Sequence, residues 1–415
     1  MSFADVYLSK QPRLFPSITL DKDLSGVIVI PCYSEPEVFV TLDSLCQCLQ
    51  PKGHYAVIVV VNFPASKAVE EEHEHRLLFA KLESYAANNK SSFLQVIPLW
   101  LGAVEKKKTG AGYARKTGMD YAIQIFNKTE HPEAFILSLD ADTMVSSNYL
   151  TEAERLFEKS TVRQIVFPFE HPKAVLPMEQ RKAIILYELH LFYYRLALQH
   201  IGWPWPYHTL GSAFGVRASV YVEQGGMNSK NAGEDFYFLN KIFPLGGTRV
   251  ATKAMVFPEA RLSDRIIFGT GPALKEIIKN DLQYETYCRE SFSEVRYFIE
   301  NIRNMFDATI PTTKIIEQAP KSLRDFWTET HFIEKIEECR RNCNLENTFV
   351  KRIYKKFDAF QVVKFLNYSH QHTYRKSPVE IEAGKLLSSM NIAPDTTSME
   401  RLHRQLQEID LRFYR

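Results

Sequence analysis

Four apolar, β-branched runs alternate with helical stretches over the first 142 residues, and this alternation narrows the fold more than any other property of the chain. The runs lie at residues 26–33, 55–63, 93–100 and 134–142. Between them the apolar residues recur every three or four positions, at residues 36–49, 70–89 and 112–126. Strands that alternate with helices at this spacing predict an α/β fold with a mostly parallel sheet and helices on both faces.

The rest of the chain divides into two parts of different character. A long helix is expected at residues 178–200, and a second, shorter α/β stretch continues to about residue 271. Beyond it the sequence predicts amphipathic helices, at residues 294–306, 322–343, 348–371 and 399–410. We therefore predict an α/β domain at residues 1–271 and a helical C-terminal region at residues 272–415.

The composition is that of an ordinary globular protein, with 45% hydrophobic and 24% charged residues in a chain of 415. A net charge of +2 gives no electrostatic basis for binding nucleic acid. The six cysteines are too sparse for a disulfide framework and lack the spacing of a zinc site. Neither a signal peptide nor an apolar stretch of about 18 residues occurs, so we expect a cytoplasmic protein without a transmembrane segment. Peripheral contact with a membrane stays open.

Polar residues follow three of the predicted strands where each strand ends, at Pro31–Glu35, Asn62 and Asp140–Asp142. In open parallel sheets ligands bind outside the carboxyl ends of the strands, so we expect these residues to share one site. Side chains alternate along a strand, which predicts that Asp140 and Asp142 face the same side. Two such carboxylates suit a divalent cation that is also bound by substrate phosphates. The alternative is that both aspartates cap the next helix.

Six segments occur in the order and spacing of a known enzyme family, at residues 27–36, 41–45, 110–122, 136–143, 211–227 and 232–242. Together they resemble a GT-A glycosyltransferase of family 2, and the resemblance covers residues 26–271. It implies the Rossmann-like GT-A fold and a hexosyltransferase that moves a sugar from a nucleoside-diphosphate sugar to an acceptor hydroxyl. The acceptor would be a sugar, a lipid-linked molecule or another hydroxyl compound. In-line attack at the anomeric carbon would invert its configuration.

The resemblance implies roles around the donor base for the residues that follow the first two strands. Tyr33 would border the nucleobase, with Pro31 beside it and Glu35 near the ribose or the base. Asn62 stands where the family often has an acid, and its amide can still both donate to and accept from a base edge. The alternative for the first segment is a turn in which Tyr33 is ordinary packing.

For the diphosphate, the resemblance implies that Asp142 coordinates a divalent metal, Mn²⁺ or Mg²⁺, and that Asp140 faces the ribose or the metal through water. Arg115 is expected near the base or the phosphates. Arg265 is a candidate for clamping the diphosphate with two hydrogen bonds. The alternative for Arg265 is a loop arginine paired with Asp264.

On the acceptor side, the resemblance implies that Asp235 is the general base and that Glu234 orients it or binds the acceptor. The alternative is that both acids only cap a helix start, where the helix dipole favours negative charge. Trp203 and Trp205 would pack against sugar faces or form a rigid hydrophobic loop. His208 would complete the metal site or be a structural histidine.

Two departures from the family pattern, Asn62 and Lys116, support a second hypothesis. It is a catalytically inactive protein of the same fold that binds nucleotide sugars or acts as a scaffold. A nucleotidyltransferase fits less well, because no glycine-rich, basic phosphate loop follows the first strand. The sequence does not identify the sugar, the base, the acceptor or the oligomeric state.

Overall fold

The computed structural model describes residues 2–11, 15, 24–105, 110–228, 233–262 and 269–413. They cluster into two compact units. The first unit contains the residues up to 176 and residues 209–272, and the second contains residues 177–208 and 273–413. We describe each unit by itself.

This division differs from the boundary that we predicted at residue 271. Helix α6 (Met178–His200) belongs to the second unit, because it packs against α16 (Val379–Ser389) and α17 (Met399–Arg412). The sequence boundary would separate α6 from both of these helices. The predicted bounds of α6 itself agree with the structure.

The first unit is built on a seven-stranded sheet. Its strands, in spatial order, are β3 (Leu94–Val104), β2 (His54–Pro64), β1 (Leu24–Cys32), β4 (Phe135–Ser138), β7 (Phe214–Arg217), β6 (Gln164–Val166) and β8 (Thr248–Val250). Strand β7 runs antiparallel to both of its neighbours, and the other six strands share one direction. The predicted α/β fold with a mostly parallel sheet is confirmed.

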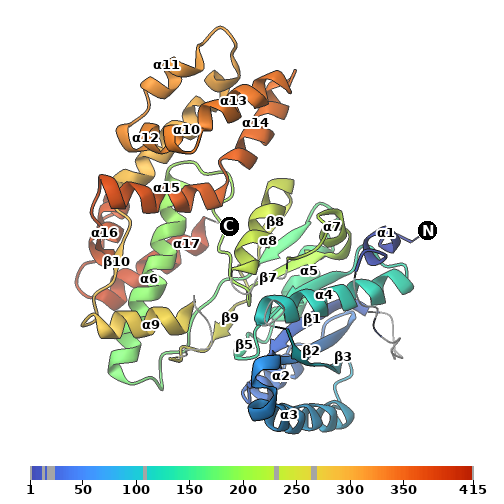
Figure 1. The fold of residues 1–415 in the computed structure, drawn as a ribbon. Coiled ribbons are helices and arrows are strands. Elements are labelled where there is room, and N and C mark those ends of the chain that lie inside the picture. The colour runs from blue at the N-terminus through green and yellow to red at the C-terminus, as the bar shows by residue number, and fades with distance from the viewer. Residues whose placement is uncertain are drawn as a thin grey trace. The chain divides into compact units, whose positions relative to one another are not determined.

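Helices cover both faces of this sheet, as Figure 1 shows. The chain passes from β1 through α2 (Val38–Cys46) to β2, and through α3 (Ala68–Asn88) to β3, moving in one direction along the sheet. It then returns through α4 (Ala111–Lys128) to β4, on the other side of β1. Because such crossovers are right-handed, this reversal places α4 on the face opposite to α2 and α3.

The core of the first unit lies along β1, β2 and α4. The side chains of residues 27–30 and 55–61 are fully buried. Helix α4 approaches the sheet closely at Gly118, where an added Cβ would lie 2.5 Å from Val29 Cγ1 and 2.9 Å from Val60 Cγ2. Gly118 therefore allows close packing of the helix on the sheet.

Shorter elements complete the first unit. They are α1 (Asp5–Leu8), the 3₁₀ turn Ala65–Lys67, β5 (Thr143–Val145), α5 (Tyr149–Phe157), α7 (Ala218–Glu223), α8 (Glu234–Ile242), the 3₁₀ turn Phe243–Leu245 and β9 (Val256–Pro258). Strands β5 and β9 pair with each other in a separate antiparallel sheet.

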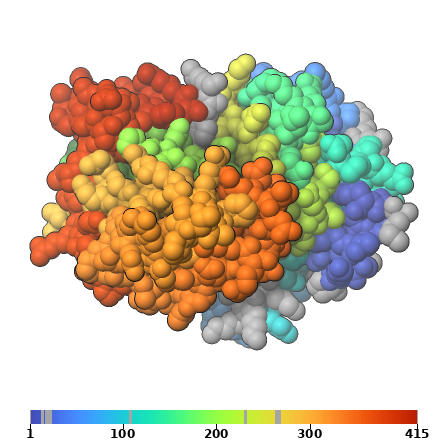
Figure 2. All heavy atoms as spheres, turned by 90° about the horizontal axis from the view of Figure 1, so that it is seen from above, coloured from blue at the N-terminus to red at the C-terminus, as the bar shows by residue number. Residues whose placement is uncertain are grey.

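The second unit is mainly helical, as predicted for the C-terminal region. Besides α6, α16 and α17, its helices are α9 (Thr270–Lys279, from residue 273 on), α10 (Arg289–Phe306), α11 (Thr312–Glu317), α12 (Lys321–Glu329), α13 (Phe332–Arg341), α14 (Glu346–Lys356) and α15 (Ala359–His372). Two short strands, β10 (Glu285–Thr286) and β11 (Ser377–Pro378), pair antiparallel. Figure 2 shows the orange part of the chain, which includes α10 to α13, as one continuous surface. In the described ranges, no helix is both long and apolar enough to cross a membrane.

Two of the predicted C-terminal helices are each broken in two. The run at residues 322–343 forms α12 and α13, which are separated at His331 by a left-handed φ of 52°. The run at residues 348–371 forms α14 and α15, and Asp358 caps α15 by accepting from the amide of Gln361 at 2.9 Å. Hydrophobic periodicity does not register a single left-handed residue or an internal cap, so the sequence predicted one helix in each place.

Candidate functional site

The residues that follow β1 and β4 meet at the point where the chain reverses its direction along the sheet. β1 and β4 are parallel neighbours, but the chain leaves β1 toward β2 and reaches β4 from β3. In open α/β sheets such a switch point leaves a crevice at the carboxyl ends of the strands, where ligands bind. Tyr33–Glu35 follow β1, and Asp140–Asp142 follow β4.

Asp140 and Asp142 lie in a turn rather than on a strand. β4 ends at Ser138, and the amide of Thr143 donates to the carbonyl of Asp140 at 3.2 Å. Strand alternation does not apply to a turn, so the argument that placed both carboxylates on one face of a strand is wrong. The alternative that they cap a helix is also wrong, because β5 lies between them and the next helix, α5.

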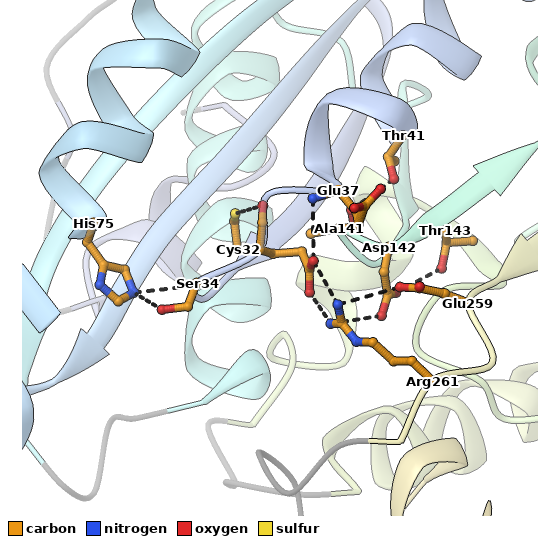
Figure 3. A network of polar contacts seen from close by, with 11 residues as sticks. Cys32, Ser34, Glu37, Thr41, His75, Ala141, Asp142, Thr143, Glu259 and Arg261 are labelled. Carbon is orange, nitrogen blue, oxygen red and sulfur yellow. Dashed lines mark hydrogen bonds and ion pairs between the residues drawn. The ribbon is translucent and has the colours of Figure 1, made fainter.

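Arg261 joins the segment after β1 to the segment after β4, as Figure 3 shows. Its guanidinium binds the carboxylate of Glu35 twice, with Nη1 donating to Oε1 at 2.9 Å and Nη2 donating to Oε2. The same guanidinium lies 3.4 Å from Asp142 Oδ2 and 3.5 Å from Glu259 Oε2. Glu35 is 4% exposed, whereas the Arg261 side chain is 29% exposed, so only the carboxylate of the pair is removed from water. Three carboxylates therefore converge on one cation.

The pairing of β5 with β9 brings Arg261 to this position. Thr143 lies opposite Pro258, so the chain that leaves β9 runs back past Asp142. The amide of Glu259 donates to the carbonyl of Asp142 at 3.1 Å, and Arg261 follows two residues later. The sequence analysis missed Arg261, because a pairing between segments so far apart along the chain leaves no local signal.

The surroundings of Asp142 favour its protonated form. Burial raises the pKa of its carboxyl group, and the charges of Asp140, Glu35 and Glu259 add to this, whereas Arg261 lowers it. The resulting pKa is about 7. Negative charge is therefore in excess around Asp142, and a further cation would stabilise the ionised carboxylate.

A second arginine, Arg115, connects Asp140 to Glu234. Arg115 is 2% exposed, and its Nη2 donates to Asp140 Oδ1 while its Nη1 donates to Glu234 Oε1. Its guanidinium thus lies between two carboxylates. Gly211 packs against this group, since an added Cβ would lie 2.7 Å from Arg115 Nη2 and 3.1 Å from Asp235 Oδ2. The segments that follow β4, precede β7 and begin α8 therefore meet at Arg115.

Asp235 lies in the first turn of α8, beside Glu234. Its Oδ1 accepts from the amide of Phe236 at 2.7 Å. Burial and the charge of Glu234 raise the pKa of Asp235 to about 6, although Arg115 and the Phe236 amide lower it. A carboxyl group that titrates close to neutral pH can accept and release a proton under physiological conditions, which suits a general base.

Helix α3 positions Tyr33. The ring of Tyr33 stacks on His75, with centroids 5.4 Å apart and planes inclined by 24°. Its hydroxyl donates to the carboxylate of Glu71 at 2.9 Å, and Lys67 Nζ donates to the hydroxyl oxygen at 3.2 Å. The side chain is half-buried, so the ring is held in place and stays partly accessible.

His75 is a second residue that the sequence analysis missed. It is fully buried, and its Nδ1 lies 2.8 Å from the carbonyl of Glu71, which requires the proton to be on Nδ1. Nε2 therefore accepts from the amide of Ser34 at 3.3 Å. Ser34 has a left-handed φ of 45°, which residues other than glycine rarely adopt, so His75 supports a strained turn after β1. Its charged neighbours in the sequence gave no sign of this burial.

Asn62 and Pro31 lie near the carboxyl ends of their strands. Asn62, in β2, is 2% exposed, and its Nδ2 has no hydrogen-bond partner among the described residues. A buried donor without a partner costs about 1–3 kcal/mol, so this amide needs a partner from outside the described chain. Pro31 is buried within β1, opposite Val60 of β2.

Arg265 and Lys116 complete the residues that the sequence analysis discussed on the donor side. Arg265 falls outside the described residues, so its role as a diphosphate clamp stays a prediction. Lys116 Nζ donates to Gln11 Oε1 at 2.9 Å and to Asp120 Oδ2 at 2.5 Å. Lys116 therefore links the N-terminal segment to α4.

The aromatic loop before β7 belongs to the second unit. Trp203 and Trp205 pack edge-on against Tyr354 of α14, with centroid distances of 5.6 and 5.1 Å. His208 Nε2 lies 3.3 Å from the carboxylate of Asp410 on α17. These contacts favour the rigid hydrophobic loop and the structural histidine among the alternatives that the sequence left open.

The carboxylates at the end of the sheet fit a hard divalent cation in their chemistry. Glu35, Asp142 and Glu259 converge on one cationic group, and Mg²⁺ and Mn²⁺ prefer oxygen ligands of this kind. Over the part of the chain that the structure describes, however, no three acidic, histidine or cysteine side chains form a complete metal-binding group. A divalent ion here would need further ligands from a substrate, such as phosphate oxygens.

Of the comparisons with known proteins, only the one with solved structures finds similar proteins. No protein-family model matches the chain, and no curated protein matches it. The chain is similar to S. aureus TarS 1–349 in complex with UDP-GlcNAc, with a TM-score of 0.39 and 13% identity over 80% of this chain and 91% of that chain. For the same TarS fragment in complex with UDP, the TM-score is 0.36 and the identity 13%, over 80% and 92% of the two chains. Similarity at this level does not establish a family.

Proposed function

We propose that this protein is a glycosyltransferase that moves a sugar from a nucleoside-diphosphate sugar to an acceptor hydroxyl, with inversion and with the help of Mn²⁺ or Mg²⁺. The observation that carries the proposal is the convergence of the segments after β1 and β4 with the start of α8. Carboxylates that suit a divalent metal lie there with Asp235, whose pKa is about 6, and Arg115 connects Asp140 to Glu234 beside it. Four of the six segments that resemble GT-A enzymes supply Glu35, Arg115, Asp142 and Asp235.

On the donor side, the proposal assigns the nucleobase to the region between β1 and β2. Tyr33 is held from behind by His75 and offers a ring face for stacking. Asn62 Nδ2, which has no partner among the described residues, supplies a donor for a base edge, and Pro31 lies in the neighbouring strand β1. Glu35 holds Arg261 at the crevice, where a diphosphate would follow the base.

The leaving diphosphate needs positive charge, whereas the acceptor hydroxyl needs a group that accepts its proton. Asp142, with Asp140 beside it, would hold a divalent ion, which would supply positive charge to the leaving diphosphate. Asp235 accepts the proton of the acceptor hydroxyl as its oxygen forms the bond to the anomeric carbon. The bond from that carbon to the diphosphate breaks on the opposite side, which inverts the configuration. Glu234 accepts a hydrogen bond from Arg115, so its role is to orient the residues around Asp235 rather than to take the proton of the acceptor.

The test is a thermal-shift panel with UDP, GDP, CDP and dTDP sugars, each with and without Mn²⁺ or Mg²⁺. A ligand at 100 times its dissociation constant adds about 2.7 kcal/mol to the stability of the protein that binds it. We expect the nucleotide sugars of one base to raise the melting temperature of the wild type when metal is present. This shift should disappear in Asp142→Ala.

The matched control is Asp325→Ala, which removes a carboxylate paired with Lys321 on α12. This variant should keep the full nucleotide-dependent shift. A wild type that none of the nucleotides stabilises would contradict the proposal. A shift without turnover of any acceptor would instead support the inactive, nucleotide-sugar-binding alternative.

A further inference from the structure

The guanidinium of Arg261 lies where a divalent cation would meet the carboxylates of the donor site. It makes two hydrogen bonds to Glu35 and contacts Asp142 and Glu259 at 3.4 and 3.5 Å. Figure 3 shows the carboxylates of Asp142 and Glu259 on the same side of the arginine head group. Asp142 is the metal ligand in the proposed function, so Arg261 contacts one of the side chains that the metal would need.

The contacts of Arg261 are unequal. The two bonds to Glu35 have the paired geometry that arginine forms with a carboxylate, and they anchor the guanidinium. The distances to Asp142 and Glu259 lie beyond ordinary charge-assisted hydrogen bonds, so those contacts are mainly electrostatic. The guanidinium can therefore move away from Asp142 while it loses little of its bonding.

One guanidinium also neutralises three carboxylates incompletely. Arg261 carries one positive charge, and carboxylate oxygens of Glu35, Asp142 and Glu259 lie 2.9, 3.4 and 3.5 Å from its guanidinium nitrogens. A divalent ion would carry twice the charge of Arg261, but it would first have to overcome the repulsion of Arg261 at short range. A diphosphate offers the guanidinium an alternative partner, since arginine binds phosphate oxygens with the same two-bond geometry.

We propose that Arg261 is a built-in counter-cation that excludes divalent metal from the empty site and leaves Asp142 for the donor's diphosphate when metal and donor bind together. This inference rests on the proposed function. It makes metal binding depend on the nucleotide, because the protein alone presents Asp142 already paired with a cation.

Binding of Mn²⁺ alone to the protein without nucleotide tests the inference directly. Free Mn²⁺ is followed by electron paramagnetic resonance as protein is added. We expect weak binding by the wild type, and Arg261→Met should bind Mn²⁺ at least about tenfold more tightly because one positive charge has gone. Arg261→Lys keeps the charge and should stay close to the wild type.

The matched control is Arg155→Met on α5. Arg155 binds the buried carboxylate of Glu152 with two hydrogen bonds, both 2.7 Å, as Arg261 binds Glu35. This pair is separate from the carboxylates that contact Arg261. Its loss should leave Mn²⁺ affinity unchanged. In a double variant, Arg261→Met with Asp142→Asn, the gain should disappear.

Folding of each variant is checked by circular dichroism, and Arg261→Gln, which keeps a polar group beside Glu35, replaces Arg261→Met if that variant unfolds. Unchanged Mn²⁺ affinity in folded Arg261→Met or Arg261→Gln would overturn the inference. The nucleotide panel on the wild type separates the two proposals. If the wild type binds a nucleotide but the Arg261 variants do not gain Mn²⁺ affinity, only the role of Arg261 is refuted. If the Arg261 variants gain Mn²⁺ affinity but the wild type binds no nucleotide, the proposed transferase is refuted, and competition between Arg261 and metal for the carboxylates stays supported.

Discussion

Two buried or half-buried arginines decide what the acidic residues of this site can do. Arg115 donates hydrogen bonds to the carboxylates of Asp140 and Glu234, and Arg261 does the same to that of Glu35. Asp235 differs, because it lies beside these charges and its carboxyl group titrates near pH 6. Neighbouring acids with such different surroundings can take different roles in one reaction.

At the residue scale, we predict that turnover depends on pH through Asp235. Burial and Glu234 raise its pKa to about 6, while Arg115 lowers it and Asp140 raises it. A general base acts when deprotonated, so kcat/KM should increase as pH rises through about 6 and level off above it. Asp235→Asn should lose about 10²–10⁴-fold in kcat with unchanged nucleotide binding. A rate that is flat between pH 5 and 8 would contradict this role.

A second prediction at the residue scale concerns Gly211. An added Cβ would press on Arg115 Nη2 at 2.7 Å, and that guanidinium is bonded to carboxylates on two sides. We expect Gly211→Ala to destabilise the protein by about 1–3 kcal/mol in thermal or urea unfolding. Gly384→Ala is the control, because its Cβ would have 3.9 Å to the nearest atom, Pro394 Cβ, and a helical glycine replaced by alanine gains up to about 1 kcal/mol. Equal effects of the two changes would refute the packing argument.

At the scale of elements, one strand pairing and a few contacts of single helices position the site residues and hold the helical unit together. The β5–β9 pairing places Arg261 beside Asp142, and His75 of α3 stacks on Tyr33 in the turn after β1. In the second unit, α17 is held to α6 by buried polar pairs. Arg195 Nε donates to Asp410, and His403 on α17 lies 2.6 Å from the carboxylate of Glu188 on α6.

We predict that Asp410 is the residue of α17 whose charge matters most for stability. Asp410→Asn would leave the buried guanidinium of Arg195 without its carboxylate, at a cost of about 3–5 kcal/mol in urea unfolding. Glu408→Gln, which alters an exposed pair with Arg412 on the same helix, should change stability by no more than about 0.5 kcal/mol.

The same aspartate should make the wild type sensitive to acid. Burial raises the pKa of Asp410, but the charges and hydrogen bonds of His208 and Arg195 outweigh it and lower the pKa below its ordinary value. A lowered pKa in the folded state means stability that is present above the unfolded pKa and lost as pH falls through the folded one. The difference between the wild type and Asp410→Asn should therefore shrink below about pH 4. A difference that stays constant from pH 7 to 3 would contradict this account.

At the scale of the whole molecule, the chain leaves the first unit at residue 176, builds α6, and returns at residue 209. A fragment of residues 1–271 would therefore carry α6 without α16 and α17. Its buried apolar side chains, among them Leu189, Phe192 and Leu196, would then face water. We predict that this fragment aggregates or binds the dye ANS, as measured by size-exclusion chromatography and fluorescence.

The matched fragment joins residue 176 to residue 209 through a short flexible linker and ends at residue 272. It keeps the seven-stranded sheet and omits the exposed helix, so it should be the more soluble of the two. A fragment of residues 1–271 that is monomeric and unfolds cooperatively would show that α6 does not depend on the C-terminal helices.

The sequence by itself determined the order of strands and helices from β1 to β4, the bounds of α6 and the helical nature of the C-terminal region, because hydrophobic period is a local property of the chain. The tertiary structure alone decided which cation each carboxylate meets. Arg261 reaches Glu35 and Asp142 through a pairing of distant strands, and Arg115 on α4 binds Glu234 at the start of α8, 119 residues further along the chain. Buried charges are stabilised by partners that are near in space and far along the chain, and local patterns do not record such partners.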